Sequence, residues 1–250
     1  MTDPTAPGPL AATAALMADP ARARMLAALM GGEALTAGEL ARVAGVTAAT
    51  ASGHLARMAD GGLLLVHAQG RHRYVRLASE EVAAAIETLG GLAARIAAPP
   101  RPWKHGEAAR AARLCWNHLA GRIGVALHAR LTGAGWLVPV PGGWDATTEG
   151  RARLAATGVD LDAAARAPRV ATHRCVARAC IARDCMDWSE RRPHLAGGLA
   201  REIATGWIGR GWLRRLPAEG DGDILARRRL ALTPEGARAL RDGLGLDLSA

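Results

Sequence analysis

Residues 47–77, TAATASGHLARMADGGLLLVHAQGRHRYVRL, specify how the first part of this chain folds. Thr47 is of a residue type that caps helices, which predicts a helix from Ala48 to about Ala59. Apolar residues at helical spacing are expected to form the buried face of this helix: Ala51, Leu55 and Met58. Polar side chains are left on the other side, as in a helix that enters the major groove of DNA.

Two glycines and a β-rich run follow this helix. Gly61-Gly62 is expected to end it, because glycine adopts left-handed backbone angles without steric cost. Residues 63–68 and 72–77 are predicted to be strands joined by a tight turn at 69–71. Such a basic hairpin can reach the DNA backbone or the minor groove. The side chains expected to contact DNA are Thr47, Thr50, Ser52, His54, Arg57, Arg71 and Arg73.

The preceding residues complete a DNA-binding motif. Thr36 and Glu39 have the spacing of a capping box, in which each side chain accepts a hydrogen bond from the other residue's amide. Gly45 is expected to make the sharp turn into the next helix. A helix, a glycine turn, a capped helix and a basic hairpin together predict a winged helix-turn-helix.

Residues 10–96 resemble the ArsR/SmtB-type winged-helix transcriptional regulators. The stretch Ser52-x-His54-Leu55-x-x-Met58, followed by Gly62-Leu63-Leu64, is similar to the family's recognition helix and the strand after it. The wing of the family is similar to Gly70-Arg71-x-Arg73-Tyr74-x-x-Leu77. Gly53 departs from the family pattern, which more often has a polar or bulky residue there.

Further helices are expected on either side of this motif. An apolar helix at residues 10–17 precedes Asp19-Pro20, which predicts the cap and first turn of a helix through about Met30. Ser79 is expected to cap a helix over residues 80–96. Its apolar stripe consists of Val82, Ile86, Leu89, Leu92 and Ile96. The resemblance implies that the first helix and this one form the interface of a homodimer.

Charge is unevenly distributed along the chain. Residues 1–98 hold eight basic and eight acidic residues, whereas residues 99–250 hold 24 and 15, so the second part carries the whole net charge of +9. DNA binding by the first part therefore depends on locally placed arginines. The basic excess of the second part fits contact with DNA or with an anionic effector, and it equally fits solvated arginines on helix surfaces.

Neither a membrane span nor a signal peptide is expected. No apolar run approaches the length of about 18 residues that a spanning helix needs, and Asp3, not a basic residue, precedes the apolar residues 9–18. Four cysteines in 250 residues are too few for a disulfide framework. We therefore expect a cytoplasmic protein with reduced thiols and no membrane partner.

The proline-rich segment 98–102 predicts a linker, and therefore domains at residues 1–98 and 104–250. In the second domain HLAG at 118–121 recurs at 194–197, and eight of the twenty positions in 118–137 are identical 76 residues later. The internal repeat, 118–161 and 194–247, predicts two units, each a long helix, a strand or hairpin and a short helix. A second domain duplicated in this way looks like that of a subset of ArsR-type regulators. The expected fold is mainly α with small β-hairpins: a winged helix-turn-helix followed by a pseudo-symmetric α+β domain.

A histidine and three cysteines lie between the repeats: His173, Cys175, Cys180 and Cys185. Steps of five do not place side chains on one helix face, but in a loop the thiols could converge into a site for a soft metal or metalloid ion. Flanking arginines such as Arg174 and Arg183 would instead lower the thiol pKa and favour redox sensing. Buried structural cysteines are the third interpretation.

The metal positions usual in the family have no ligands here. Ala41 and Val43 stand where some members carry cysteines, and residues 80–96 contain no His, Asp or Cys. The resemblance alone therefore does not imply metal sensing. His118 and His194, at equivalent places in the repeats, fit ligand binding, but also a capping or core role.

No catalytic motif is present, so the chain is not expected to be an enzyme. The sequence predicts a homodimeric, sequence-specific transcriptional regulator that binds double-stranded DNA, with a repressor that responds to a small-molecule or metal effector as the leading hypothesis. The alternatives are a DNA-architectural protein without a sensor, and an enzyme with an appended DNA-binding domain.

Overall fold

The structure of the protein is a computed structural model that describes residues 7–70, 72–96, 106–166, 180–217 and 228–248. Contacts divide these residues into two compact units. The first comprises the described residues up to Ile86, with Pro217, and the second those from Glu87 to Leu216 and from Arg228 onward. The expected linker at 98–102 lies outside the described residues, so a domain boundary at residue 98 stays a prediction.

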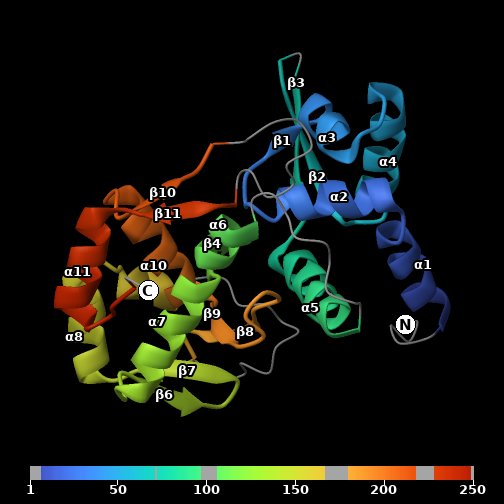
Figure 1. Cartoon of the computed structure of the whole chain (residues 1–250). Helices are drawn as coiled ribbons and strands as arrows, with labels where there is room; N and C mark the ends of the chain where they lie inside the picture. The colour runs from blue at the N-terminus through green and yellow to red at the C-terminus, as the bar shows by residue number, and fades with distance from the viewer. Residues whose placement is uncertain (1–6, 71, 97–105, 167–179, 218–227, 249–250) are drawn as a thin grey trace. The chain divides into compact units, whose positions relative to one another are not determined.

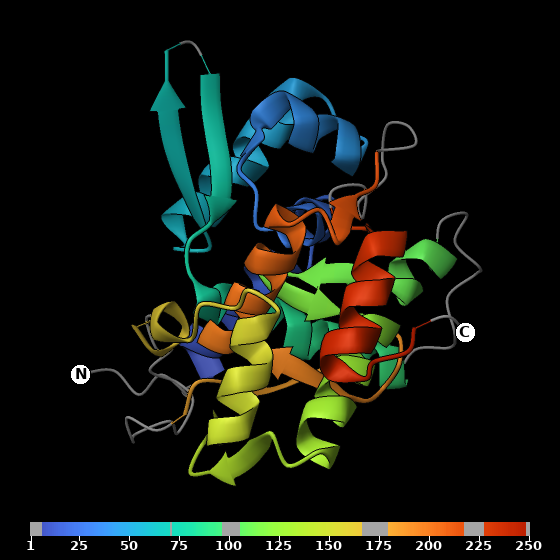
Figure 2. The ribbon, with the colours of Figure 1, turned by 90° about the vertical axis from the view of Figure 1, so that its left-hand side faces the viewer.

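The first unit combines helices with one antiparallel sheet (Figure 1). Its elements are α1 (Pro7–Met17), α2 (Pro20–Leu29), β1 (Leu35–Thr36), α3 (Ala37–Ala44), α4 (Ala48–Asp60), β2 (Leu64–Gln69), β3 (His72–Leu77) and the start of α5 (Glu80–Ile96). The sheet has the strand order β1-β3-β2. Beyond the short β1, strands β2 and β3 continue as a two-stranded ribbon, the wing (Figure 2).

Local capping fixes the ends of α3 and α4. Thr36 Oγ1 accepts a hydrogen bond from the Glu39 amide at 3.2 Å, and Glu39 Oε2 accepts one from the Thr36 amide at 2.8 Å. Gly45 ends α3 with a φ of 70°, and Thr47 Oγ1 accepts from the Thr50 amide at 3.2 Å. The predicted capping box, glycine turn and N-cap are all confirmed, and with them the winged helix-turn-helix.

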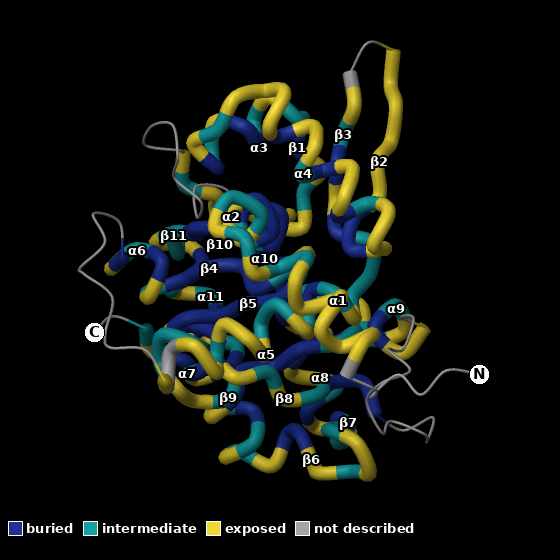
Figure 3. Tube along the Cα trace, turned by 90° about the vertical axis from the view of Figure 1, so that its right-hand side faces the viewer, coloured by how far each residue is buried: buried dark blue, intermediate teal, exposed yellow. Residues whose placement is uncertain are grey.

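The apolar faces of the first unit meet in one core. Ala51, Leu55 and Met58 of α4 are buried as predicted. α2 and α3 pack on each other and on α4, and they contribute buried residues that include Met25, Leu26, Leu29, Leu40 and Ala44. By contrast, β2 is exposed along most of its length (Figure 3). Because α4 buries only the face that carries Ala51, Leu55 and Met58, its other face is open to solvent.

Two stretches of the second unit share one order of elements: hairpin, helix, hairpin, helix. The first contains β4 (Arg113–Cys115), β5 (His118–Ala120), α7 (Arg122–Gly133), β6 (Leu137–Val140), β7 (Gly143–Ala146) and α8 (Thr148–Ala156). The second contains β8 (Arg183–Met186), β9 (Pro193–Ala196), α10 (Gly198–Gly209), β10 (Leu213–Arg215), β11 (Leu230–Leu232) and α11 (Pro234–Leu244). Two short helices are α6 (Gly106–Ala111) and α9 (Leu161–Arg166). The repeated residues HLA are thus strand, and a hairpin that the sequence did not predict precedes each long helix.

The two stretches pack crosswise. α7 contacts β9 and α10 contacts β5, while β5 and β9 also contact each other. Gly121 and Gly197, which start the two helices, have φ angles of 77° and 92°, a region that glycine enters without strain. Because each helix lies on the strand of the other stretch, the two hairpins are brought together at the centre of the unit.

Two tryptophans at equivalent positions of the repeat, Trp136 and Trp212, belong to the core of the second unit. Trp136, Trp207 and Trp212 are all buried among its apolar side chains. Across the described part of the chain, no helix combines the length and apolarity needed to cross a membrane.

Candidate nucleic-acid interface

The solvent-exposed face of α4 has small residues at its centre. Counting 100° per residue from the buried face places Gly53 near the middle of the opposite side, between Ala49 and Ala56. Thr50 and Arg57 flank this strip on one side, and both are exposed. Such a face allows the helix backbone to approach a groove closely while polar side chains reach base edges or phosphates.

The hydroxyl groups of this face are held close to the helix. Thr47 Oγ1 and Thr50 Oγ1 lie 2.9 Å apart, and Ser52 Oγ donates to the Ala48 carbonyl at 2.9 Å. All three side chains are exposed. They remain predicted DNA contacts, since each hydroxyl keeps hydrogen-bonding capacity beyond its local partner.

His54 lies at the edge of this face and is half-buried. Its Nδ1 lies 3.3 Å from a guanidinium nitrogen of Arg22, and its Nε2 lies 3.9 Å from Asp19 Oδ1. Arg22 in turn donates to the carbonyl oxygens of Ala15 and Leu16. In this conformation His54 joins α4 to the start of α2, so its predicted base contact would require the imidazole to leave these partners.

The wing, which follows α4 in the sequence, carries exposed arginines. Arg73 and Arg76 of β3 are exposed, and they lie opposite Ala68 and Leu65 of β2. Gln69 pairs with His72, so β2 extends one residue further toward the turn than predicted. Arg71 lies outside the described residues, and its DNA contact stays a prediction.

Replacing Gly53 by alanine is expected to stabilise the first unit. A Cβ built at Gly53 meets nothing within 4 Å, and glycine inside a helix costs about 0.5–1 kcal/mol relative to alanine. The free energy of unfolding should therefore rise by about that amount in thermal unfolding followed by circular dichroism. Gly45→Ala is the matched control, because its φ of 70° makes the same substitution destabilising. A destabilised Gly53→Ala variant would contradict the exposed position assigned to this residue.

The predicted thiol strip, meaning His173, Cys175, Cys180 and Cys185, is described only in part. His173 and Cys175 lie outside the described residues. Cys180 is buried, and its thiol donates to the Ala182 carbonyl at 3.1 Å. Cys185 lies instead beside three residues that the strip did not include: Cys115, His118 and His194. These four are the described residues that could hold a metal ion.

The environment of Cys185 does not favour a thiolate. A hydrogen bond with Cys115 lowers the pKa of Cys185, but burial and the Glu87 carboxylate outweigh it and raise that pKa. The expectation that neighbouring arginines activate this thiol for redox chemistry is therefore not supported at Cys185, although Arg183 does act in the expected direction.

Comparison with known proteins relates the chain to bacterial regulators. Residues 17–67 match the helix-turn-helix domain family. The uncharacterized HTH-type transcriptional regulator YdfF of Bacillus subtilis is 34% identical over 209 residues, which cover 83% of this chain and 88% of YdfF. The HTH-type transcriptional regulator YgaV of Escherichia coli is 38% identical over 73 residues, 29% of this chain and 74% of YgaV. A crystal structure of a predicted DNA-binding transcriptional regulator from E. coli is 36% identical with a TM-score of 0.31, and the match covers 33% of this chain and 87% of that one.

The similarity to YdfF includes the second unit. The alignment with YdfF spans 209 residues, which is more than the first unit contains. The two proteins therefore share more than the DNA-binding motif. Together with the winged helix-turn-helix of the first unit, this match shows that the chain belongs to the HTH-type transcriptional regulators and is a DNA-binding regulator of transcription.

Proposed function

We propose that the chain is a homodimeric, sequence-specific repressor of the ArsR type that responds to an effector through its second unit and acts in the cytoplasm. The observation that carries the proposal is the exposed face of α4, with Gly53 at its centre and Thr50 and Arg57 beside it. A helix of this shape suits the floor of the major groove, and the arginines of the wing suit the phosphates beside it.

Exposed apolar side chains on α5 support the homodimer. Leu89, Leu92 and Ile96 follow helical spacing on one face, and they are 50%, 41% and 75% exposed. Leu10 of α1 is also exposed. Apolar patches of this kind mark association surfaces, and the resemblance to ArsR-type regulators assigns dimerisation to the same two helices.

The second unit supports a role beyond DNA binding. It has its own large hydrophobic core and is included in the similarity to YdfF. A DNA-architectural protein has no need of such a unit, whereas an effector-responsive regulator does. The family to which the chain belongs consists of regulators, and we do not propose an enzymatic activity.

A two-fold symmetric operator is expected when duplex DNA bound by the protein is selected from a random pool. A dimer with one α4 per protomer should select half-sites about one helical turn, roughly 10 base pairs, apart. Leu89→Glu/Leu92→Glu should abolish dimerisation in analytical ultracentrifugation and weaken operator binding. Val138→Glu, at another exposed apolar residue, is the control and should do neither. Selection of an asymmetric site that the double variant binds normally would refute the dimer.

A further inference from the structure

In the second unit, the hairpins β4–β5 and β8–β9 each pair a cysteine with a histidine. Cys115 lies directly across from His118 in β4–β5, and Cys185 lies across from His194 in β8–β9. Because β5 and β9 contact each other, the two pairs meet. One potential ligand atom from each of the four residues lies within 4.8 Å of all the others.

Both imidazole rings are buried and have unsatisfied ring nitrogens. His118 is 3% exposed and His194 is 0% exposed, and their ring centroids are 5.2 Å apart. The Nε2 atoms of both rings are buried without a hydrogen-bond partner among the described residues. A buried polar nitrogen without a partner is unfavourable, because it has lost its hydrogen bonds to water. Histidines with unpaired ring nitrogens, clustered with two thiols, therefore point to a ligand that the four residues share.

The Nδ1 atom of each ring lies near a side-chain oxygen, and at His194 the separation is too long for a hydrogen bond. His118 Nδ1 lies 3.3 Å from Asn117 Oδ1, and His194 Nδ1 lies 3.5 Å from Asp187 Oδ2. Asp187 is itself fixed, because Arg113 donates to its Oδ1 at 2.8 Å and the Gly121 amide to its Oδ2 at 2.7 Å. An oxygen behind the non-ligating nitrogen is the usual arrangement around metal-bound histidine.

The charges around the cluster suit a metal complex. Both imidazole rings and the Cys115 side chain are buried, and the charged neighbours are the Glu87 carboxylate and the arginines Arg113, Arg183 and Arg228. Two thiolates would balance the two charges of a divalent cation, and the arginines would balance Glu87.

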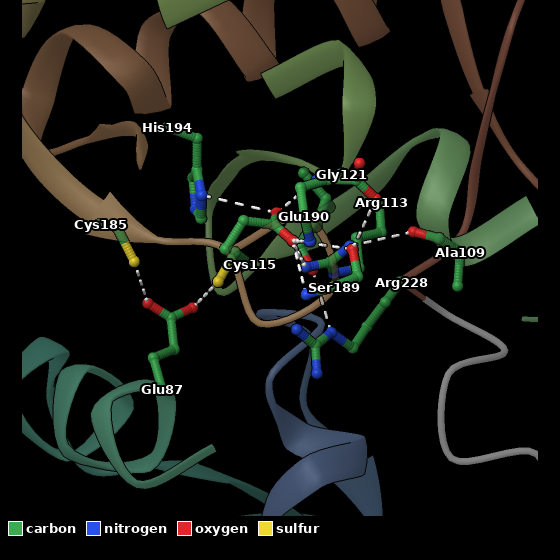
Figure 4. A network of polar contacts seen from close by, with 12 residues as sticks. Glu87, Ala109, Arg113, Cys115, Gly121, Cys185, Ser189, Glu190, His194 and Arg228 are labelled. Atoms are coloured by element: carbon green, nitrogen blue, oxygen red, sulfur yellow. Dashed lines mark hydrogen bonds and ion pairs between the residues drawn. The ribbon is translucent and has the colours of Figure 1, made fainter. Parts of the chain in front are cut away.

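Glu87 contributes an acidic group to the same place. Its carboxylate lies between the sulfur atoms of Cys115 and Cys185 (Figure 4), and accepts hydrogen bonds from both thiols. Glu87 lies on the side of α5 opposite the exposed apolar residues Leu89, Leu92 and Ile96. The cluster therefore contacts the inner face of the helix whose outer face we assign to the dimer.

We propose that Cys115, His118, Cys185 and His194 bind one zinc(II) ion in tetrahedral geometry. Two sulfur and two nitrogen donors are the ligand set that selects zinc over harder cations. Donors around tetrahedral zinc are about 3.3–3.8 Å apart, so the cluster would contract slightly on binding. Binding forms two Zn–S and two Zn–N bonds and releases the two thiol protons to solvent. The proposal does not depend on DNA binding, and either can fail without the other.

Cobalt(II), a spectroscopic substitute for zinc, provides the test. The full chain, reduced and freed of metal, should bind one cobalt(II) with sulfur-to-metal charge-transfer absorption and the intense visible bands of a tetrahedral site, and zinc(II) should displace it stoichiometrically. Cys115→Ser/Cys185→Ser should lose the charge-transfer bands and bind zinc at least about 100-fold more weakly. Cys180→Ser, which changes a buried thiol outside the cluster, should keep both.

Variants with single histidine changes guard against misfolding of the double cysteine variant. His194→Asn and His118→Asn should each retain charge transfer, lose tetrahedral band intensity and bind zinc more weakly, with unchanged far-ultraviolet circular dichroism. The proposal is wrong if the wild-type chain gives no sulfur-to-cobalt absorption, if Cys180→Ser abolishes it as fully as the double variant does, or if thiol titration of the unreduced, metal-free chain shows Cys115 and Cys185 as a disulfide.

Discussion

Arg57→Ala/Arg73→Ala is expected to weaken operator binding roughly 100-fold. Arg57 on α4 and Arg73 on the wing are both exposed, and we assign both to phosphates. A charged hydrogen bond contributes about 1.5 kcal/mol or more, and two of them amount to about two factors of ten. The plot of log affinity against log salt concentration should also become shallower by about 1.8, the value for two phosphate contacts.

The control for this prediction removes the same charge elsewhere. Arg153 and Arg241 are exposed arginines of the second unit, in surface ion pairs with Glu149 and Asp247. Arg153→Ala/Arg241→Ala should change operator affinity and salt slope little. Equal losses in the two double variants would show that net charge, and not the α4–wing surface, determines binding.

Arg113→Met is expected to destabilise the second unit by about 3–5 kcal/mol. Arg113 and Asp187 are both 0% exposed, and their ion pair measures 2.8 Å. Removing one partner of a buried pair leaves the other charge without compensation, which costs about that much. Urea unfolding followed by tryptophan fluorescence measures this loss, because all seven tryptophans lie beyond residue 98. Arg122→Met is the control: its ion pair with Glu107 is exposed and should contribute less than about 1 kcal/mol.

The same ion pair makes the free energy of unfolding depend on pH in the acid range. Burial alone would raise the pKa of Asp187, but the charge and hydrogen bonds of Arg113 and the Gly121 amide outweigh it and hold that pKa well below its usual value. A lowered pKa adds stability that is present above the unfolded-state pKa of about 4 and is lost as the pH falls below it. Asp187→Asn should therefore flatten the urea-stability profile below pH 4. A profile as steep as that of the wild type would show that Asp187 does not carry this dependence.

The first unit could be predicted closely because its signals are local. The capping box at Thr36 and Glu39, the turn at Gly45 and the cap at Thr47 each act within four residues. Sequence spacing alone therefore placed α3, α4 and the wing to within one or two residues. Gly61 shows the limit of such signals: it closes α4 at a φ of −81°, and the left-handed residue is Gly62.

The cysteine–histidine cluster could not be predicted from the constant 76-residue spacing of the internal repeat. The histidines are 76 residues apart and fall into the repeat, but the β8–β9 connection is longer than the two-residue β4–β5 connection. Cys185 therefore lies opposite His194 in its hairpin, although Cys115 and Cys185 do not occupy equivalent positions of the sequence repeat. The available signal was a cysteine preceding each HLAG; that the two hairpins meet depends on the crosswise packing of α7 and α10, which no local pattern encodes.

The ratio of affinities for the selected operator and for random duplex DNA tests the central claim most directly. Sequence-specific regulators bind their sites at least about 1,000-fold more tightly than other DNA at physiological salt. Competition binding by the full chain at about 0.15 M salt should give a ratio of that size. Thr50→Ala should lower the ratio roughly 5- to 150-fold, which corresponds to the loss of about 1–3 kcal/mol from one base contact. A ratio near one for the wild-type chain would contradict sequence-specific recognition by α4 and leave a DNA-architectural protein as the better account.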